Sequence, residues 1–207
     1  MSSTTPSKTA GSTAISWTNG DLASAAQYKS SAIDVSAKFA IAFNIQIARR
    51  TGTAFTAGYP KVRIEASGKS SGDDTWIPLA EFVPTVGASI ANTTANGAIA
   101  ANDATFVVAA ATNMAIGDYL FLGHTTDPTK YELIRVKSLS GTTITPEHNV
   151  VNAHDTGAMI TDQAEAYFPV FDCSAYTRMR AVADNANSGQ AAAFQVLYNL
   201  LDSLTTA

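Results

Sequence analysis

The feature that most constrains the fold is a ten-residue stretch, Phe39–Ala48, in which two kinds of side chain alternate strictly. The odd-numbered positions carry large apolar side chains, Phe39, Ile41, Phe43, Ile45 and Ile47. The even-numbered positions carry small or uncharged polar side chains, Ala40, Ala42, Asn44, Gln46 and Ala48. Successive side chains of a β-strand point to opposite sides of the sheet, so this period of two predicts a half-buried strand. The second face carries no charge, which suits a contact surface better than a free solvent face.

Shorter stretches elsewhere follow the same pattern. Val62–Glu65 and Trp76–Val83 are expected strands, separated by the polar turn Ser67–Asp74. Pro78 cannot donate a ladder hydrogen bond, so its strand should lie at a sheet edge or carry a bulge. The last apolar segment fits either a strand or a helix. We predict a strand over Ala192–Leu200, because the turn before it is typical of a hairpin.

The middle of the chain has a different composition. Gly87–Asp103 is rich in Ala, Asn and Thr and has few large apolar residues, so we interpret it as a linker. Five short strands are expected after it, over Thr105–Ala110, Tyr119–Gly123, Tyr131–Leu139, Thr142–Thr145 and Ala158–Asp162. Five short strands within about 60 residues indicate a small β-barrel or β-roll.

The sequence therefore predicts an all-β protein made of a jelly-roll-like β-sandwich with an inserted module. The sandwich should comprise residues 13–86 together with 165–207, and the inserted small β-barrel or β-roll with its linker should comprise 87–164. Residues 1–12 have no hydrophobic period and are expected to form a flexible arm. Such an arm either frays or becomes ordered against a neighbouring subunit.

Composition limits the classes of partner. Charged residues make up 14% of the chain, against about 25% in average soluble proteins. A weakly charged surface suits a protein covered by neighbours in an assembly, although a plain secreted β protein would share it. The net charge of -4 offers no basic excess for phosphates, so we expect no nucleic-acid partner. With no secretory signal or membrane span apparent, we expect a protein that is made in a cytoplasm and assembled there.

Candidate metal and nucleotide sites are weak. Glu147, His148, His154 and Asp155 are the only grouping with metal-ligand types, and no cysteine pair or His-Glu-x-x-His helix supports them. We expect loop histidines bonded to backbone groups, and no metal. Gly68-Lys69-Ser70 resembles the end of a phosphate-binding loop, but the first glycine of that motif is missing. No cofactor is therefore predicted.

Candidate catalytic groups are equally sparse. Cys173, the single cysteine, excludes a disulfide within one chain and is expected to be buried on a strand. No serine lies in a Gly-x-Ser-x-Gly turn, and the spacing of the carboxylates Asp73, Asp74, Glu81 and Glu165 does not indicate an acid–base pair. We therefore predict no catalytic residue and no enzymatic activity.

Two tryptophans offer a further alternative. Trp17 and Trp76 could stack on sugars, as in a carbohydrate-binding module. A tryptophan at the start of a strand is more often part of the core of a sandwich, and we favour that interpretation.

Two stretches resemble tailed-bacteriophage virion proteins that contain a β-sandwich. They are Trp76-Ile77-Pro78-Leu79 after a Gly-Asp-Asp turn, and Phe171–Arg180 followed by Asp184-Asn185. The inserted segment 106–154 resembles a module common in the same proteins. Its marks are Ala115–Tyr119, Glu132–Lys137, Ser140–Ile144 and Val151–His154. The resemblance extends over most of residues 15–200, and it rests on turn-and-strand patterns.

This resemblance implies a structural role in a virion. We expect a capsid cement or decoration protein that binds the major capsid protein or other virion proteins and forms a homo-oligomer, such as a trimer. A tail, neck or head-fibre component is an alternative within the same particle. A carbohydrate-binding module is an alternative of a different class.

Overall fold

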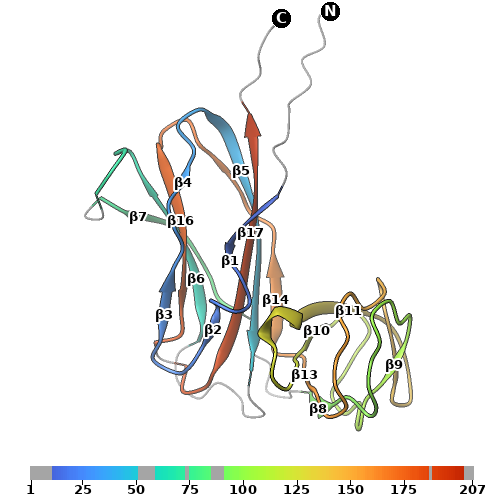
Figure 1. Cartoon of the computed structure of the whole chain (residues 1–207). Helices are drawn as coiled ribbons and strands as arrows, with labels where there is room; N and C mark the ends of the chain where they lie inside the picture. Colours follow the sequence, from blue (N-terminus) through green and yellow to red (C-terminus); the bar gives the residue numbers. More distant parts are fainter. Residues whose placement is uncertain (1–10, 51–58, 73–74, 85–90, 187, 203–207) are drawn as a thin grey trace, which may run out of the picture.

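The computed structural model describes residues 11–50, 59–72, 75–84, 91–186 and 188–202. These residues form strands almost throughout, and the one short helix among them is the 3-10 turn η1 (Pro128–Lys130). Figure 1 shows two packed sheets with a smaller strand-rich unit beside one end. The predicted all-β class is confirmed.

The first layer, called the β5 sheet, is built around the two longest strands. Its members are β1 (Ser12–Ile15), β2 (Asp21–Leu22), β5 (Lys38–Arg49), β14 (Ala164–Tyr167), β15 (Val170–Asp172) and β17 (Ala192–Asp202). The order is β1-β17-β5-β14, with β2 also paired to β17 and β15 also paired to β5. All of these pairs are antiparallel.

The second layer, called the β6 sheet, completes the sandwich. Its members are β3 (Gln27–Lys29), β4 (Ile33–Asp34), β6 (Lys61–Ser67), β7 (Ile77–Phe82) and β16 (Arg178–Asp184). The order is β3-β16-β6-β7, and β4 also pairs with β16. If β1/β2, β3/β4 and β14/β15 each count as one interrupted strand, the two orders are those of a jelly roll. The predicted jelly-roll-like sandwich is confirmed.

The core lies between these two sheets. Ile41, Phe43, Ile45 and Ile47 of β5 are buried there, together with residues such as Ile64 of the opposite sheet. Phe39 was expected to join them, but it is 57% exposed. Opposite Phe39 the register of β5 and β17 shifts, from Leu201↔Ala40 to Asp202↔Lys38. Phe39 therefore has no register partner on β17 and lies outside the core.

Two uncertain strands are settled by the pairing. β17 pairs with β5 from Ala192↔Arg49 to Asp202↔Lys38, so the strand prediction for Ala192–Leu200 is confirmed and the helical alternative is wrong. Among the described strands, β7 pairs only with β6 and forms a sheet edge. The register shifts next to Pro78, which lies opposite Glu65. The strand that contains Pro78 therefore has both the edge position and the bulge, the two alternatives predicted for it.

The chain between β7 and β14 forms a sheet of its own. Its strands are β8 (Asn92–Thr94), β9 (Phe106–Val107), β10 (Tyr119–Leu122), β11 (Glu132–Ser140), β12 (Thr143–Pro146) and β13 (Met159–Thr161), in the order β8-β13-β10-β11-β12-β9. The two end strands meet through an Ala95↔Val108 bridge, and the Ala109 N–H donates to the Thr94 carbonyl at 2.9 Å. These contacts close a small barrel around its own apolar core, as predicted.

The linker predicted for Gly87–Asp103 is wrong where the structure describes it. Asn92–Thr94 is strand β8, Ala91 and Ala95 are buried, and Ile99 forms a bridge with His154. Alanines fill the barrel interior here, and their small side chains give little periodic signal. Residues 85–90 lie outside the described residues. At the N-terminus, β1 already includes Ser12, which was assigned to the arm, and residues 1–10 are likewise outside the described part.

Candidate functional site

The most distinctive surface of the molecule is the outer face of the β5 sheet. The outward side chains of β5 are Ala40, Ala42, Asn44, Gln46 and Ala48, and they lie in register with Leu201, Asn199, Leu197, Gln195 and Ala193 of β17. None of these ten side chains is charged. The neutral face predicted from β5 alone therefore extends over the neighbouring strand, and it is called the neutral face below.

The outer face of the β6 sheet has the opposite chemistry. Lys61 pairs with Glu81 at 3.0 Å, Arg63 with Asp184 at 3.3 Å, and Arg180 with Glu65 at 2.8 Å. The guanidinium carbons of Arg180 and Arg178 lie 4.2 and 4.9 Å from the centre of the Trp76 ring. These charges are matched within the sheet, which suits the burial of Glu65, Arg180 and Asp184, while Lys61 and Glu81 are more exposed.

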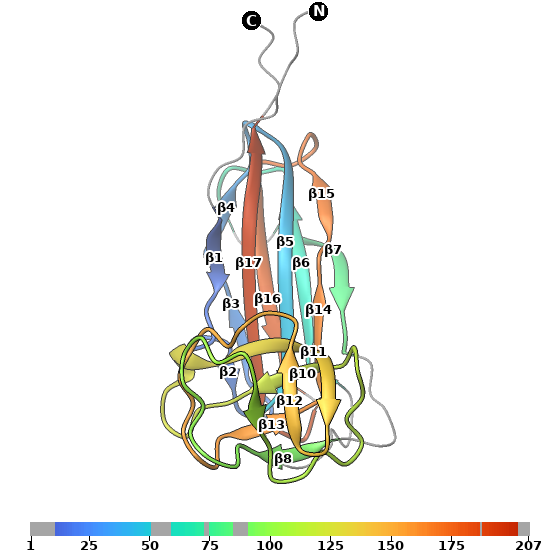
Figure 2. The same ribbon diagram turned by 90° about the vertical axis from the view of Figure 1, so that its right-hand side faces the viewer.

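The barrel covers one end of the neutral face. Trp17, Ala48 and Ala193 form a buried cluster with Phe121 and Tyr131 of the barrel. The Trp17 ring lies 5.8 Å from that of Phe121, which lies 5.1 Å from that of Tyr131. Figure 2 shows the barrel in front of the lower part of the sheet, with the upper parts of β5 and β17 uncovered. Part of the predicted contact surface therefore contacts the chain's own inserted barrel.

The uncovered part of the neutral face has an apolar border. Ala42, Leu197 and Asn199 are partly exposed. On the edge formed by β14 and β15, Phe168 and Val170 are each 65% exposed. An uncharged surface with large apolar side chains beside it has the composition of the centre of a protein–protein interface, where charged residues are depleted.

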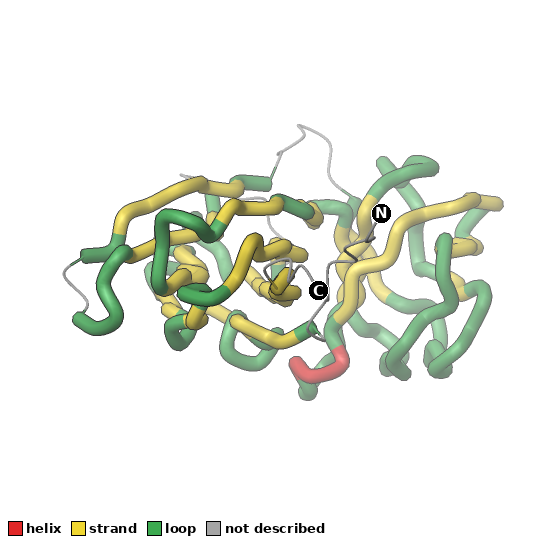
Figure 3. The backbone as a smooth tube through the Cα atoms, turned by 90° about the horizontal axis from the view of Figure 1, so that it is seen from above, coloured by secondary structure: helices red, strands yellow, loops and turns green. Residues whose placement is uncertain are grey.

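A cleft lies where the barrel meets this face. Its larger hollow has a volume of about 400 Å³ and is lined by Asn44, Gln46, Tyr119, Leu133, Arg135, Glu147, His148, Ala166 and Phe168. A smaller hollow of about 240 Å³ also includes Gln46 and Leu133, together with Trp17, Tyr131 and Gln195. Because two residues line both hollows, the cleft extends along the junction of barrel and sheet. Figure 3 shows this junction from above.

Arg49 forms hydrogen bonds with both chain segments that connect the sandwich to the barrel, one at Ala91 and the other at Thr161 and Gln163. Its side chain is fully buried, and Nη2 donates to Thr161 Oγ1 at 2.6 Å and to the Ala91 carbonyl at 3.5 Å. Its backbone N–H donates to the Gln163 carbonyl at 2.8 Å. Burial lowers the pKa of Arg49 and raises the pKa of nearby Asp162. Sequence reasoning missed this residue, although its parity in β5 places it on the core side.

The four predicted metal-type residues separate into different surroundings. Glu147 pairs with Arg135 at 3.0 Å, and His148 lines the larger hollow. Asp155 accepts from Thr125 Oγ1 at 2.5 Å, which lowers the pKa of its carboxyl. Within the ranges that the structure describes, no three His, Cys, Asp or Glu side chains are placed to hold a metal ion.

His154 is bonded to a backbone group, as expected, and also to a carboxylate. Its Nδ1 lies 2.7 Å from the Gly123 carbonyl and its Nε2 lies 2.8 Å from Glu132 Oε1, so both ring nitrogens face acceptors. Glu132 also accepts from the backbone N–H groups of Val151 and Asn152, each at 2.9 Å. His154 and Glu132 therefore form a hydrogen-bonded pair inside the barrel wall.

The remaining sequence candidates are structural. Cys173 is 2% exposed in the sandwich core, one residue after β15 rather than within a strand, and burial raises the pKa of its thiol to about 11. Lys69 lies in the turn after β6, where its carbonyl accepts from Thr177 and Arg178. Glu165 lies on β14. Asp73 and Asp74 lie outside the described residues.

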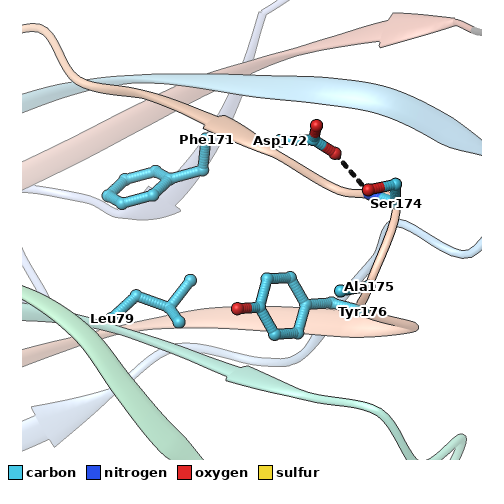
Figure 4. Close-up of a pocket in the computed structure, with 6 residues that line it drawn as sticks. All are labelled: Leu79, Phe171, Asp172, Ser174, Ala175 and Tyr176. Atoms are coloured by element: carbon cyan, nitrogen blue, oxygen red, sulfur yellow. Dashed lines mark hydrogen bonds between the residues drawn. The ribbon is translucent and has the colours of Figure 1, made fainter.

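A further hollow of about 370 Å³ opens between β7 and β15. Figure 4 shows Leu79 and Tyr176 on one side and Phe171 on the other. Its one carboxylate, Asp172, accepts from the Ser174 N–H at 2.7 Å, and this bond lowers the pKa of Asp172. Among the described residues that line the hollow there is no second carboxylate and no histidine, lysine or arginine beside Asp172.

Comparison with known proteins gives little. No protein-family model matches the chain, and no curated protein matches it. Among solved structures, the crystal structure of SPBc2 prophage-derived protein YomS is similar over 98% of this chain and 99% of its own, with 9% identity and a TM-score of 0.31. Similarity at this level assigns neither a fold nor a function. No helix in the described part of the chain is long and apolar enough to cross a membrane.

Proposed function

We propose that this chain is a non-enzymatic structural protein of a bacteriophage particle, and specifically a capsid cement or decoration protein. Its jelly-roll topology is an architecture used by viral capsid proteins, among others. The turn-and-strand patterns shared with tailed-phage virion proteins support the same assignment. The virion is thus its proposed location, and the major capsid protein is its proposed partner.

The neutral face is the observation that carries this proposal. Ala42, Leu197 and Asn199 carry no charge, and the charges at the upper end of the face are the Lys38–Asp202 pair and Asp172 beside Ala40. The opposite face of the sandwich carries several matched ion pairs. A face without charge can be dehydrated against a neighbour without leaving an ion unpaired. The same sheet already makes such a contact, because Ala48 and Ala193 pack against the barrel.

The mechanism of cementing would be mass action. A protein that binds the assembled shell, and not its free subunits, stabilises the shell by an amount that grows with its concentration over Kd. Copies bound through the neutral face would add this free energy at many sites of one shell. No chemical step and no bound cofactor are required.

Binding to shells tests the proposal. We would substitute Ala42→Arg on the neutral face and, as a matched control, Gln27→Arg on the outer face of the β6 sheet, where Asp184 is the register partner of Gln27. In co-sedimentation with shells of the major capsid protein, Ala42→Arg should abolish binding and Gln27→Arg should leave it unchanged. Equal binding by both variants would contradict the proposed surface.

A tail, neck or head-fibre component is the second candidate, since such proteins also assemble through protein contacts. Copy number separates the two, because a cement protein should approach the abundance of the capsid protein in quantitative mass spectrometry of purified particles. Self-association is proposed as well, and light scattering of the purified chain would give its oligomeric state.

A further inference from the structure

The cleft between barrel and β5 sheet has a lining suited to a small polar ligand. We propose that it binds an uncharged saccharide. Its larger hollow, of about 400 Å³, lies at the junction of two structural units. That volume is within the range of small-molecule sites, and such junctions are a frequent location for them. This inference goes beyond the structural role proposed above and does not depend on it.

The polar lining offers both donors and acceptors. Gln46 Nε2 donates to Asn44 Oδ1 at 3.3 Å, which orients both amides. Among the described residues nothing else bonds to these two side chains, so Gln46 Oε1 remains an acceptor and Asn44 Nδ2 a donor. His148 adds a further ring nitrogen at the rim. A sugar hydroxyl donates and accepts at once, and it therefore requires this mixture.

The charges of the lining cancel. Arg135 Nη1 and Glu147 Oε1 are 3.0 Å apart, and their side chains are 47% and 39% exposed. Each retains hydrogen-bonding capacity toward a ligand, but the pair has no net charge. An anionic ligand would meet the Glu147 carboxylate, and a cationic ligand would meet the Arg135 guanidinium. The lining therefore favours an uncharged ligand.

Aromatic side chains border the same hollow. Phe168 lines the hollow and is 65% exposed. Tyr119 also lines it, and the guanidinium carbon of Arg135 lies 5.9 Å from the centre of the Tyr119 ring. The C–H face of a pyranose ring is apolar, while its rim carries hydroxyls. An exposed ring beside amides and an ion pair matches both parts of a sugar. The two tryptophans first considered for this role are unsuitable, because Trp17 is buried and Trp76 is stacked with arginines.

Binding of the full chain to a glycan array, followed by titration calorimetry with the retained glycans, would test the proposal. The array would carry neutral hexose and N-acetylhexosamine oligosaccharides, with sialylated and phosphorylated glycans for comparison. Two variants are compared: Phe168→Ala, inside the hollow, and Val170→Ala, which removes an equally exposed side chain outside its lining. We expect a neutral glycan to be retained, at least tenfold weaker binding for Phe168→Ala, and unchanged binding for Val170→Ala.

Circular dichroism would establish that both variants are folded. If Phe168→Ala were unfolded, Glu147→Gln would replace it, with the same tenfold loss expected. The proposal is overturned if no neutral glycan is retained, if acidic glycans bind better, or if the variants in the hollow bind normally. None of these results depends on whether the chain binds capsid shells.

Discussion

Glu132 and His154 form a buried pair in the barrel wall, with Oε1 and Nε2 separated by 2.8 Å. Glu132 also accepts two backbone N–H groups, from Val151 and Asn152. The pair thereby ties the segment before β13 to strand β11. It accounts for the histidine that sequence analysis singled out as a metal-type residue, and it assigns that histidine a structural role.

Removal of the carboxylate charge at Glu132 should destabilise the protein. Glu132→Gln replaces the carboxylate that bonds to His154 and to two backbone N–H groups with a neutral amide, and breaking a buried pair in this way costs about 3 kcal/mol. Urea denaturation at pH 7 would measure the loss. Glu147→Gln is the control, because its pair with Arg135 is exposed and should contribute less than about 1 kcal/mol. Equal midpoints for the two variants would show that the buried pair is not stabilising.

The Arg49 contacts should make stability depend on pH. The pKa of Asp162 is raised in the folded state, first by burial, and Arg49 opposes this rise. A carboxyl whose folded pKa is raised contributes stability below its ordinary value of 3.8 and loses it as pH rises through the folded pKa. Arg49→Met removes the opposing charge. The free energy of unfolding of Arg49→Met should therefore be lower than that of the unsubstituted protein by about 2 kcal/mol at pH 7, and the difference should be smaller at pH 4. Urea denaturation at the two pH values would measure it. A deficit independent of pH would contradict the assignment.

Gly20 should not tolerate a side chain. A Cβ at this position would lie 2.0 Å from the backbone oxygen of Phe194, whose N–H donates to the Gly20 carbonyl at 3.0 Å. Gly20→Ala must push two backbone segments apart, and we expect a loss of about 3 kcal/mol or more. At Gly68, the nearest atom to an added Cβ is the Ala175 oxygen at 4.0 Å, so Gly68→Ala should be tolerated. Thermal unfolding of both variants would compare them.

The Cys173 thiol should be unreactive in the folded protein. Burial raises its pKa to about 11, so about one thiol in a thousand is ionised at pH 8, and the side chain is also inaccessible. Ellman's reagent at pH 8 should detect almost no thiol in native protein and one per chain in guanidinium chloride. Rapid labelling of the native protein would show that the sandwich core opens readily near β15.

Sequence periodicity predicted the sandwich because its core strands alternate strongly. Phe43, Ile45 and Ile47 are large and apolar, so their alternation shows which side of β5 faces the core. Pro78 has no backbone N–H to donate, and this predicted that its strand lies at a sheet edge. Asn92–Thr94 escaped detection because three small polar residues give no amphipathic contrast. The closure of the barrel through Ala95 and Val108 is a pairing between distant residues, which no local pattern encodes.

The candidate surfaces were only partly predictable. The absence of charge on β5 was evident, but its neighbour β17 could be aligned with it only once the register Gln46↔Gln195 was known. Arg49 and His154 have partners, Thr161 and Glu132, that lie far away in sequence. The cleft needs side chains from both the sandwich and the barrel, so its existence depends on how the two units pack.

Cryo-electron microscopy of purified phage particles would test the central claim most directly. The account predicts density for this chain on the capsid, with the outer face of β5 and β17 against a neighbouring protein and the charged face of the β6 sheet toward solvent. Density confined to the tail would contradict the cement role. Density on the capsid with the neutral face exposed to solvent would contradict the proposed contact surface.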